Sequence, residues 1–344
     1  MRSSSSAPLS AQNDRAERTW PLRRVSWNMP IPSRGFVSHY GAAFILIVVC
    51  LVGAILSPEF LTPSNLLNVL RQNSMLALMA LGMTAVILAG GIDLSVGSVL
   101  ALAGVTTAAL SAYGSTVAIV GGVSVGLLIG LLNGVLIAPL RLPPFIVTLA
   151  TMIAARGAAL GFTGEHSVPV APTAAGIAWL GQGWIGDIPV PVIVFAVAYL
   201  IGWGYLRYTR SGRHLYAVGD DEEAARLLGL RVDRLLVGVY AACGALAGLA
   251  GVVLAGRLGA GQPVAGMGWE LDAIAAVVVG GTLLTGGYGG AGRTLTGVLL
   301  LGVILNLLNL DGTLSPWWQN VVRGVFLLVV VLISGARPRR SAHA

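Results

Sequence analysis

Long apolar segments recur along this chain, and they constrain its fold more than any other feature. A segment of about 20 residues with few charges is long enough to cross a bilayer as a helix. Of the 344 residues, 56% are hydrophobic and only 10% are charged, whereas soluble chains carry about 25% charged residues. A soluble helical domain is therefore excluded, and the sequence predicts an all-α, polytopic membrane protein embedded in a lipid bilayer.

The apolar runs predict about ten transmembrane helices within one domain, 40–334. They lie at 40–57, 68–90, 95–112, 115–139, 145–162, 188–206, 235–255, 271–286, 294–310 and 318–334. Residues 1–39, rich in Ser, Arg and Pro, are expected to form a disordered cytoplasmic tail, and 335–344 a short C-terminal tail. A cleaved signal peptide is not expected, because the first apolar run is long enough to span the membrane.

Arginine predicts the orientation of these spans. All 21 basic residues of the Lys and Arg class are Arg, and such residues concentrate on the cytoplasmic side. With ten spans and the N-terminus inside, seventeen of the 21 fall on the cytoplasmic side, six of them in 207–234. Both termini are therefore expected in the cytoplasm. The net charge of +7 is interpreted as this topology signal, so no nucleic-acid partner is expected.

Two polar segments lie between the predicted spans. The outer stretch 163–187 has no Lys or Arg but contains Glu165 and Asp187; a docking surface and a passive loop explain it equally well. The cytoplasmic stretch 207–234 is where a soluble partner is expected to bind. Cys50 and Cys243 lie inside apolar runs, so we expect packed thiols rather than a disulfide.

Residues 219–230 read Gly-Asp-Asp-Glu-Glu-Ala-Ala-Arg-Leu-Leu-Gly-Leu and predict a short cytoplasmic helix. Asp220 followed by Glu223 is typical of a capping box with Asp in the cap position. Strong helix formers follow, and Gly229 is placed to end the helix. The residues alone leave two interpretations open, an ordinary capped surface helix and a helix that docks on a partner.

Residues 90–98, Gly-Gly-Ile-Asp-Leu-Ser-Val-Gly-Ser, interrupt two apolar runs. A carboxylate there is costly unless it lines a cavity or satisfies freed backbone groups. Two glycines allow the helix to unwind, and Asp93 and Ser95 can cap the helix that follows. Discontinuous helices of this kind often form substrate sites in transporters. The residues also fit a plain turn between helices with Asp93 as its N-cap.

Several blocks resemble known transporters. Glu223-Ala224-Ala225 followed by Gly229 is similar to the EAA-x-x-x-G element of ABC-importer permeases, without the Ile-x-Leu-Pro ending of the maltose type. Leu81-Gly82-Met83-Thr84 leading into the 90–98 segment resembles the signature of ribose-, xylose- and arabinose-type permeases, within the branched-chain amino acid and sugar permease superfamily. The segments 213–229, 270–282 and 316–319 also match this family, so that the resemblance covers 40–334.

The resemblance implies the permease subunit of an ABC importer that carries a small sugar or related polyol across a bacterial inner membrane. It implies three partners, namely an ATP-binding cassette ATPase subunit, a periplasmic or extracellular sugar-binding protein, and a second permease copy in a homodimer. The predicted ATPase-coupling residues are Glu223, Ala224, Ala225, Leu228 and Gly229. The predicted substrate-pathway residues are Gly90, Gly91, Asp93, Ser95 and Gly97.

Other functions fit less well. A Walker A phosphate loop requires Lys, and the chain has none, so ATP hydrolysis is assigned to the partner. An ion-coupled secondary transporter is the alternative, because it would keep ionisable groups inside the membrane; Asp93, Arg156, Asp272 and Arg323 are the nearest candidates. A membrane enzyme is not expected, since the four histidines are scattered. No cofactor, metal site or catalytic residue is predicted.

Overall fold

The computed structural model describes residues 34–312 and a few isolated positions between 315 and 328. The predictions for residues 1–33 and for the C-terminal tail at 335–344 lie outside the described residues, as does nearly all of the predicted last span, 318–334.

Helices make up most of the described chain. In order, they are α1 (Arg34–Leu56), α2 (Pro63–Leu88), α3 (Val96–Leu110), α4 (Ser115–Ile137), α5 (Pro144–Thr163), α6 (Ala175–Gln182), α7 (Val190–Tyr208), α8 (Arg210–Asp220), α9 (Glu222–Leu227), α10 (Val232–Leu258), α11 (Trp269–Val279) and α12 (Ala291–Asp311). A 3-10 turn, Ser111–Tyr113, follows α3. Two short antiparallel pairs join β1 (Val168–Pro169) to β4 (Ala260–Gly261) and β2 (Trp184–Ile185) to β3 (Ile188–Pro189).

The all-α, polytopic prediction is confirmed, but the count of ten spans is not. Seven helices in the described part of the chain are long and apolar enough to cross a membrane, and α1 adds a shorter apolar stretch. The span predicted at 271–286 is wrong in length, because α11 ends at Val279. At 1.5 Å per residue, its 11 residues reach about 16 Å, roughly half of the bilayer's hydrocarbon thickness. Helix α1 also begins at Arg34, inside the predicted tail.

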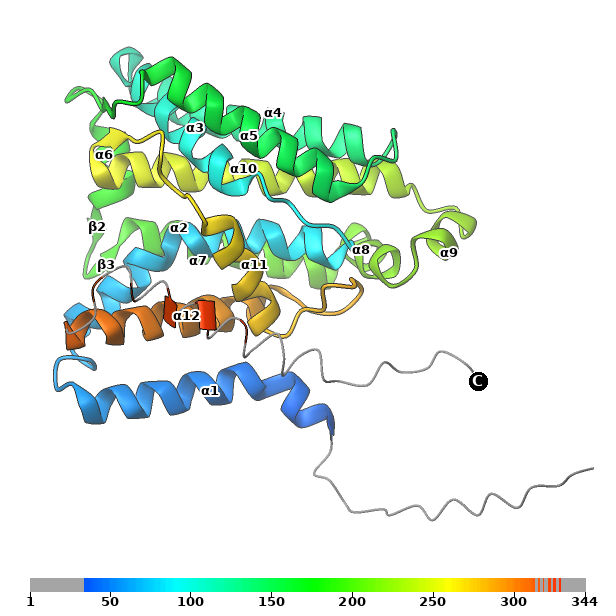
Figure 1. Ribbon diagram of the computed structural model, residues 1–344, viewed down its shortest axis with the longest axis horizontal. Coiled ribbons are helices and arrows are strands. Elements are labelled where there is room, and N and C mark those ends of the chain that lie inside the picture. Colours follow the sequence, from blue (N-terminus) through cyan, green and yellow to red (C-terminus); the bar gives the residue numbers. More distant parts are fainter. Residues whose placement is uncertain are drawn as a thin grey trace, which may run out of the picture.

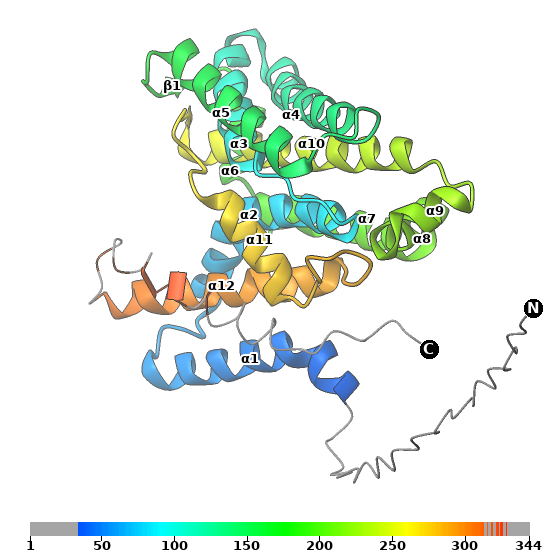
Figure 2. The ribbon, with the colours of Figure 1, turned by 45° about the vertical axis from the view of Figure 1, so that its right-hand side comes forward.

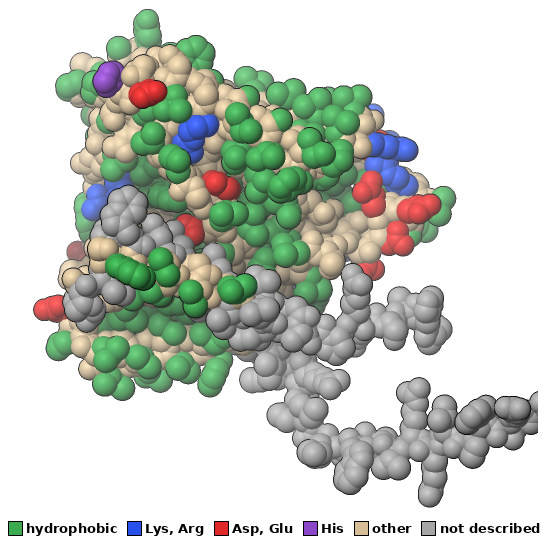
Figure 3. Space-filling model, viewed as in Figure 1, with side chains coloured by type: hydrophobic (Ala, Val, Ile, Leu, Met, Phe, Trp, Pro, Cys, Tyr) green, Lys and Arg blue, Asp and Glu red, His purple; other side chains and the backbone are tan. Residues whose placement is uncertain are grey.

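The long helices lie alongside one another, and the two polar segments lie at opposite ends of the bundle (Figure 1). Helices α8 and α9 occupy one end, whereas α6 and the β2–β3 pair occupy the other, and a second view shows the same separation (Figure 2). The segments 207–234 and 163–187 are thus on opposite sides of the bundle. Between the ends, hydrophobic side chains dominate the visible face, as a lipid-facing surface requires (Figure 3).

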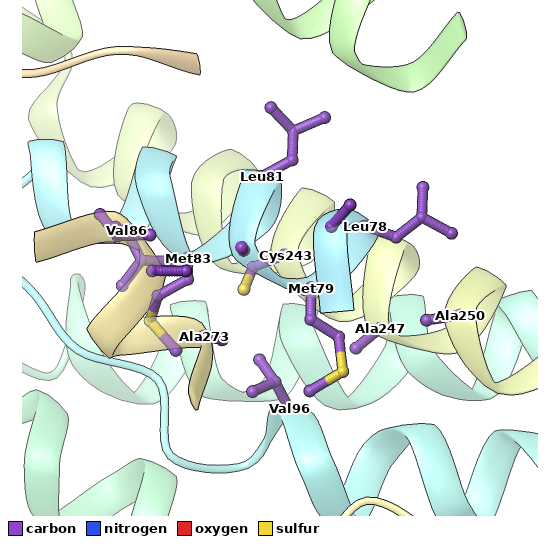
Figure 4. Close-up of a cluster of buried hydrophobic side chains, with 14 of the residues drawn as sticks. Leu78, Met79, Leu81, Met83, Val86, Val96, Cys243, Ala247, Ala250 and Ala273 are labelled. Atoms are coloured by element: carbon purple, nitrogen blue, oxygen red, sulfur yellow. The ribbon is translucent and has the colours of Figure 1, made fainter. Parts of the chain in front are cut away.

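The core lies where α2 and α10 cross α3 and α11. Met79 and Met83 of α2, Val96 of α3 and Ala273 of α11 are fully buried in one cluster with Cys243 of α10 (Figure 4). Both cysteines are free thiols, as predicted.

Glycines allow the closest helix contact in the bundle. Every fourth residue of α4 from Gly122 to Gly134 is a buried Gly. A Cβ at Gly126, Gly130 or Gly134 would meet the α10 backbone at 3.0 Å or less. This spacing keeps the glycines on one face of α4, where small residues let membrane helices pack through their backbones.

Two helices, α3 and α11, begin inside the bundle rather than at its ends (Figures 1 and 2). Each follows a non-helical segment. Residues 89–95 return from the end of α2 to the start of α3, and the segment 259–268 leads from α10 to α11. These two interruptions place irregular backbone in the middle of the membrane domain, which is tolerated only where protein or a cavity surrounds it.

Candidate functional site

The first interruption, 89–95, is shaped by glycine. Helix α2 ends at Leu88, and Gly90 adopts φ +81°, a left-handed conformation that favours Gly. A Cβ on Gly91 would overlap the hydroxyl of Tyr240 on α10. The prediction that two glycines release the chain from helical geometry therefore agrees with the backbone seen here.

Asp93 holds this interruption in place. Its side chain is 1% exposed, and Oδ1 accepts hydrogen bonds from the Ser95 backbone N–H at 2.9 Å and the Ser95 hydroxyl at 2.6 Å. Asn133 of α4 then donates to the Ser95 hydroxyl at 3.0 Å. The Ser95 side chain makes no cap hydrogen bond to α3, so the predicted capping role of Ser95 is wrong: its hydroxyl donates to Asp93 instead.

The five predicted pathway residues line none of the cavities described below. Gly90 is exposed, while Gly91, Asp93, Ser95 and Gly97 are buried. In this conformation the side chains of Asp93 and Ser95 form hydrogen bonds with polar groups of the protein at the break between α2 and α3. Contact between these five residues and a transported solute stays a prediction.

The second interruption, 259–268, is held by Arg156, which lies outside the predicted pathway residues. Arg156 of α5 donates from Nη1 to the carbonyl oxygens of Pro263 at 2.6 Å and Ala265 at 2.7 Å. The two interruptions also meet, because a Cβ on Gly97 would lie 2.5 Å from the carbonyl oxygen of Gly266. The signal for Arg156 was present in the sequence as a charge within an apolar run, but nothing indicated its partners 107 and 109 residues away.

The predicted coupling segment is two helices rather than one. Gly219 and Asp220 end α8, and α9 begins after Asp221. The predicted cap at Asp220 is therefore wrong by one residue: Asp221 Oδ1 accepts from the Ala224 backbone N–H at 2.9 Å. Asp221 can act as the N-cap because its backbone is extended, with φ of −155° and ψ of 103°, as N-cap residues require.

Gly229 ends α9 as predicted. Its φ is +79°, its N–H donates to the Arg226 carbonyl at 3.0 Å, and the Leu230 N–H donates to the Ala225 carbonyl at 3.1 Å. These two bonds define a Schellman ending, in which Gly best tolerates the left-handed position.

The residues of the predicted coupling segment face two ways. Ala225 is 2% exposed and packs with Val218, Val232 and Leu236 of its own chain. Leu227 and Leu228 are 85% and 79% exposed, and Glu223 and Ala224 are also exposed. Acidic and basic side chains gather at the end of the bundle where α9 lies (Figure 3), so these leucines are apolar groups on an otherwise polar end.

Arg226 fastens α9 to the start of α10. Its guanidinium forms ion pairs with Glu222 at 2.8 Å and Asp233 at 2.6 Å. Hydrogen bonds to the carboxylates of Asp233 and Glu222 raise the pKa of Arg226 further above its ordinary value. Both pairs are partly exposed, so they orient α9 more than they stabilise the fold.

A glycine junction joins α8 to the first interruption and to the loop after α11. A Cβ on Gly219 would overlap the Leu88 carbonyl oxygen at the end of α2 and would lie 2.6 Å from the Gly287 nitrogen. The Gly287 N–H donates to the same Leu88 carbonyl at 3.0 Å. A Cβ on Gly286 would lie 3.0 Å from the Gly90 nitrogen. The end of α8 thus touches the segment that leads to α3 and the loop that follows α11.

A polar cavity of about 250 Å³ lies between α2, α11 and α12. Its polar and aromatic lining consists of Gln72, Asn73, Trp269, Asp272, Asn306 and Asn309. It is large enough to hold several water molecules. Four amides, a carboxylate and an indole ring can exchange hydrogen bonds with hydroxyl groups. Sequence reasoning named only Asp272, as a candidate ion-coupling group, and missed the others, although polar amides inside apolar helices are the signal that could have indicated them.

The outer segment 163–187 is a folded cap. Strand β1 pairs with β4, and the Gln182 side chain donates to the Gly256 carbonyl at 3.0 Å. The Ala171 backbone N–H donates to the Ser111 hydroxyl at 2.8 Å. This segment is therefore tied to the ends of α3 and α10.

Comparisons with known proteins identify the family. The sequence profile of the family described as "Branched-chain amino acid transport system / permease component" matches residues 65–331. The ribose import permease protein RbsC of Escherichia coli K12 is 43% identical over 309 residues, covering 89% of this chain and 96% of the relative. RbsC of Bacillus subtilis 168 is 44% identical over 301 residues, with coverage of 87% and 93%.

A relative that is named for a different sugar matches a similar share of this chain. The D-allose transport system permease protein AlsC of Escherichia coli K12 is 39% identical over 302 residues, covering 87% of this chain and 92% of the relative. No solved structure matches this chain.

Proposed function

Because this chain belongs to the branched-chain amino acid transport system / permease component family, we propose that it is the permease subunit of an ABC importer for a small sugar or related polyol. It would carry the sugar across the inner membrane of a bacterium into the cytoplasm, using ATP hydrolysed by a partner subunit. The relatives named as ribose and D-allose permeases support the substrate class. The family is one of transport subunits, not of enzymes.

The exposed face of α9 is the observation that carries the proposal. Leu227 and Leu228 project from a polar end of the bundle, where exposed apolar side chains indicate a partner surface. The ATPase subunit would cover this face, while buried Ala225 and the Schellman ending hold α9 on the membrane domain. The glycine junction would then pass a movement of α8 to the interruption that precedes α3 and to the loop that follows α11.

Two further partners complete the proposed importer. The folded cap at 163–187 would receive the extracytoplasmic sugar-binding protein, and a second copy of this chain would complete the path as a homodimer. The end with α8 and α9 would be cytoplasmic, together with both termini. The arginine distribution supports this orientation, since 207–234 holds six Arg and 163–187 none.

The polar cavity supports a sugar rather than a branched-chain amino acid as the solute. Its amides and carboxylate suit a neutral, hydroxyl-rich ring, and Trp269 offers an indole face. A branched-chain amino acid would require an apolar pocket for its side chain and paired partners for its two charges. We propose Gln72, Asn73 and Trp269 as solute contacts in this cavity.

Docking is tested by variants of α9. Leu228→Asp should release the ATPase, because it places a charge in the proposed interface, whereas Ala225→Leu and Gly229→Val should weaken docking by distorting α9. Asp220→Asn is the control, since Asp220 is exposed and is not the cap of α9. Co-purification of the ATPase and sugar uptake are measured together; full association in all three variants would place the docking surface elsewhere.

Substrate and energy source are tested in proteoliposomes that contain permease, ATPase and binding protein. We expect ATP-dependent uptake of D-ribose or D-allose and none of L-leucine. Gln72→Leu should lower sugar uptake about 3- to 10-fold, the effect of one lost hydrogen bond; Asn68→Leu, on the same helix but outside the cavity, should not. Uptake driven by an ion gradient without the ATPase would instead establish the secondary-transporter alternative.

A further inference from the structure

A second large cavity lies at the end of the bundle that carries α8. It measures about 700 Å³ and is bounded by α1, α7, α8, the loop after α11 and the first turns of α12. The residues that matter below are Ala42, Trp203, Arg207, Tyr216, Tyr288 and Arg293. Neither the solute nor the ATPase is assigned to this cavity by the function proposed above.

The cavity lining is cationic and aromatic. Arg207 and Arg293 both line it, and no Asp or Glu is among the described residues that do. Arg293 lies over the Tyr288 ring at 4.5 Å and donates to the Tyr288 hydroxyl at 3.0 Å, so its guanidinium is held in one orientation. Arg207 lies in the last turn of α7, is exposed and makes no ion pair within the described part of the chain. Two guanidinium groups in one cavity, with Arg293 held in place and Arg207 exposed, favour the binding of an anionic ligand that carries a phosphate.

Tyr216 adds a hydrogen-bonding group from α8. Its hydroxyl donates to the Gly289 carbonyl at 3.2 Å. Burial raises the pKa of Tyr216, against the lowering effect of the nearby Arg293 charge, so the phenol keeps its proton at neutral pH. The Tyr216 contact also ties α8 to the loop that forms the cavity wall.

The helices that flank the cavity are lipid-facing. On α1, Phe44 and Ile47 are 66% and 58% exposed, and on α7, Leu200 and Ile201 are 65% and 66% exposed. Ala42, two residues before Phe44, and Trp203, two residues after Ile201, line the cavity itself. Trp at the end of a span is typical of the membrane interface. The cavity is therefore continuous with surface that acyl chains would cover.

We propose that this cavity binds the headgroup of an anionic phospholipid, with Arg207 and Arg293 contacting its phosphate and the faces of α1 and α7 contacting its acyl chains. Basic pockets between transmembrane helices at the cytoplasmic side are the kind of site that holds such headgroups. The lipid would bridge α7, α8 and α12, and so hold α8 against the loop at Gly289. This inference does not depend on which solute is carried or on the ATPase.

The test uses the full-length chain reconstituted in nanodiscs and spin-labelled phosphatidylglycerol or phosphatidylcholine as the probe. Wild type should prefer phosphatidylglycerol. Arg207→Gln and Arg293→Gln should each lower this preference about 5-fold, since each Arg near an anionic surface contributes about 1 kcal/mol. Arg210→Gln is the matched control, because Arg210 is exposed on α8 and does not line the cavity. Arg293→Lys, which keeps the charge, should retain most of the preference.

Three results would overturn the proposal. The first is an unchanged preference in both Arg→Gln variants. The second is an equal loss in Arg210→Gln, which would indicate general surface charge. The third is displacement of the labelled lipid by millimolar inorganic phosphate, which would indicate a site for soluble anions. Near-wild-type unfolding temperatures in Arg207→Gln would show that a lost preference is not a loss of fold.

Discussion

The two interrupted regions of the membrane domain reach the same outcome by different chemistry. Residues 89–95 are held by their own side chains, with Asp93 and Ser95 paired within the segment and Asn133 supporting them from α4. Residues 259–268 are held by a guanidinium from α5, which binds two of their carbonyl oxygens. Both interruptions let a helix begin inside the bundle.

This difference determines how each region depends on the rest of the fold. The 89–95 segment carries its own hydrogen-bond acceptor, so its shape survives as long as Asp93 is buried there. In the 259–268 segment, β4 pairs with β1, but the carbonyls of Pro263 and Ala265 depend on α5 staying in position. A movement of α5 would therefore alter 259–268 first. It would reach 89–95 through the contact of Gly97 with Gly266 and through the Thr148 hydroxyl of α5, which donates to the Ile92 carbonyl at 3.4 Å.

Asp93→Ala should have the largest effect. It leaves two Ser95 donors without their acceptor, and unpaired buried groups cost about 1–3 kcal/mol each. We expect sugar uptake to fall about 100-fold, which corresponds to about 3 kcal/mol, while the ATPase still co-purifies. Asp93→Asn, which keeps one acceptor oxygen, should recover part of the activity. Asp187→Ala in the exposed outer segment is the control; wild-type uptake in Asp93→Ala would make Asp93 a tolerated turn residue.

Arg156→Ala should come next, because it releases the Pro263 and Ala265 carbonyls, at a cost of about 2 kcal/mol in total. Hydrogen exchange should rise in 259–268 and remain unchanged in 89–95. Arg156→Lys should lie between wild type and Arg156→Ala, since an ammonium cannot present the same planar set of donors. Equal changes in both segments would mean that the two interruptions form one unit.

Gly97→Ala should disturb both segments by a smaller amount. The added methyl group would lie 2.5 Å from the Gly266 carbonyl and would overlap the Glu270 carboxylate; overpacking of this kind costs about 1–3 kcal/mol. Gly157→Ala on α5 is the control, as nothing lies within 4 Å of its added Cβ. Unfolding temperatures in detergent measure the difference, and equal values for the two variants would contradict the close contact.

Glu270→Gln should have the smallest effect. The Glu270 charge acts on Arg156, but the glutamate is partly exposed, and such pairs contribute about 0.2–1 kcal/mol. We expect nearly wild-type uptake and only slightly faster hydrogen exchange in 259–268. A loss as large as that of Arg156→Ala would show that Glu270, rather than the two carbonyls, is the main partner of Arg156.

The coupling segment shows where local sequence was sufficient and where it was not. Gly229 was identified as the end of α9 because a left-handed position after strong helix formers is a local property. The choice between Asp220 and Asp221 as the cap was not local. Gly219 must remain at the end of α8, where only Gly fits against the Leu88 carbonyl, and this moves the start of α9 by one residue.

The sequence by itself determined the all-α membrane class, the broken helix around Asp93 and the family, because hydropathy, paired glycines and short motifs are properties of neighbouring residues. Only the tertiary structure decided that α11 is a half-length helix, that Arg156 holds a segment more than 100 residues away, and that Ala225 faces its own chain while Leu227 and Leu228 do not. These features depend on packing between elements distant in sequence, and apolar periodicity does not specify which helix meets which.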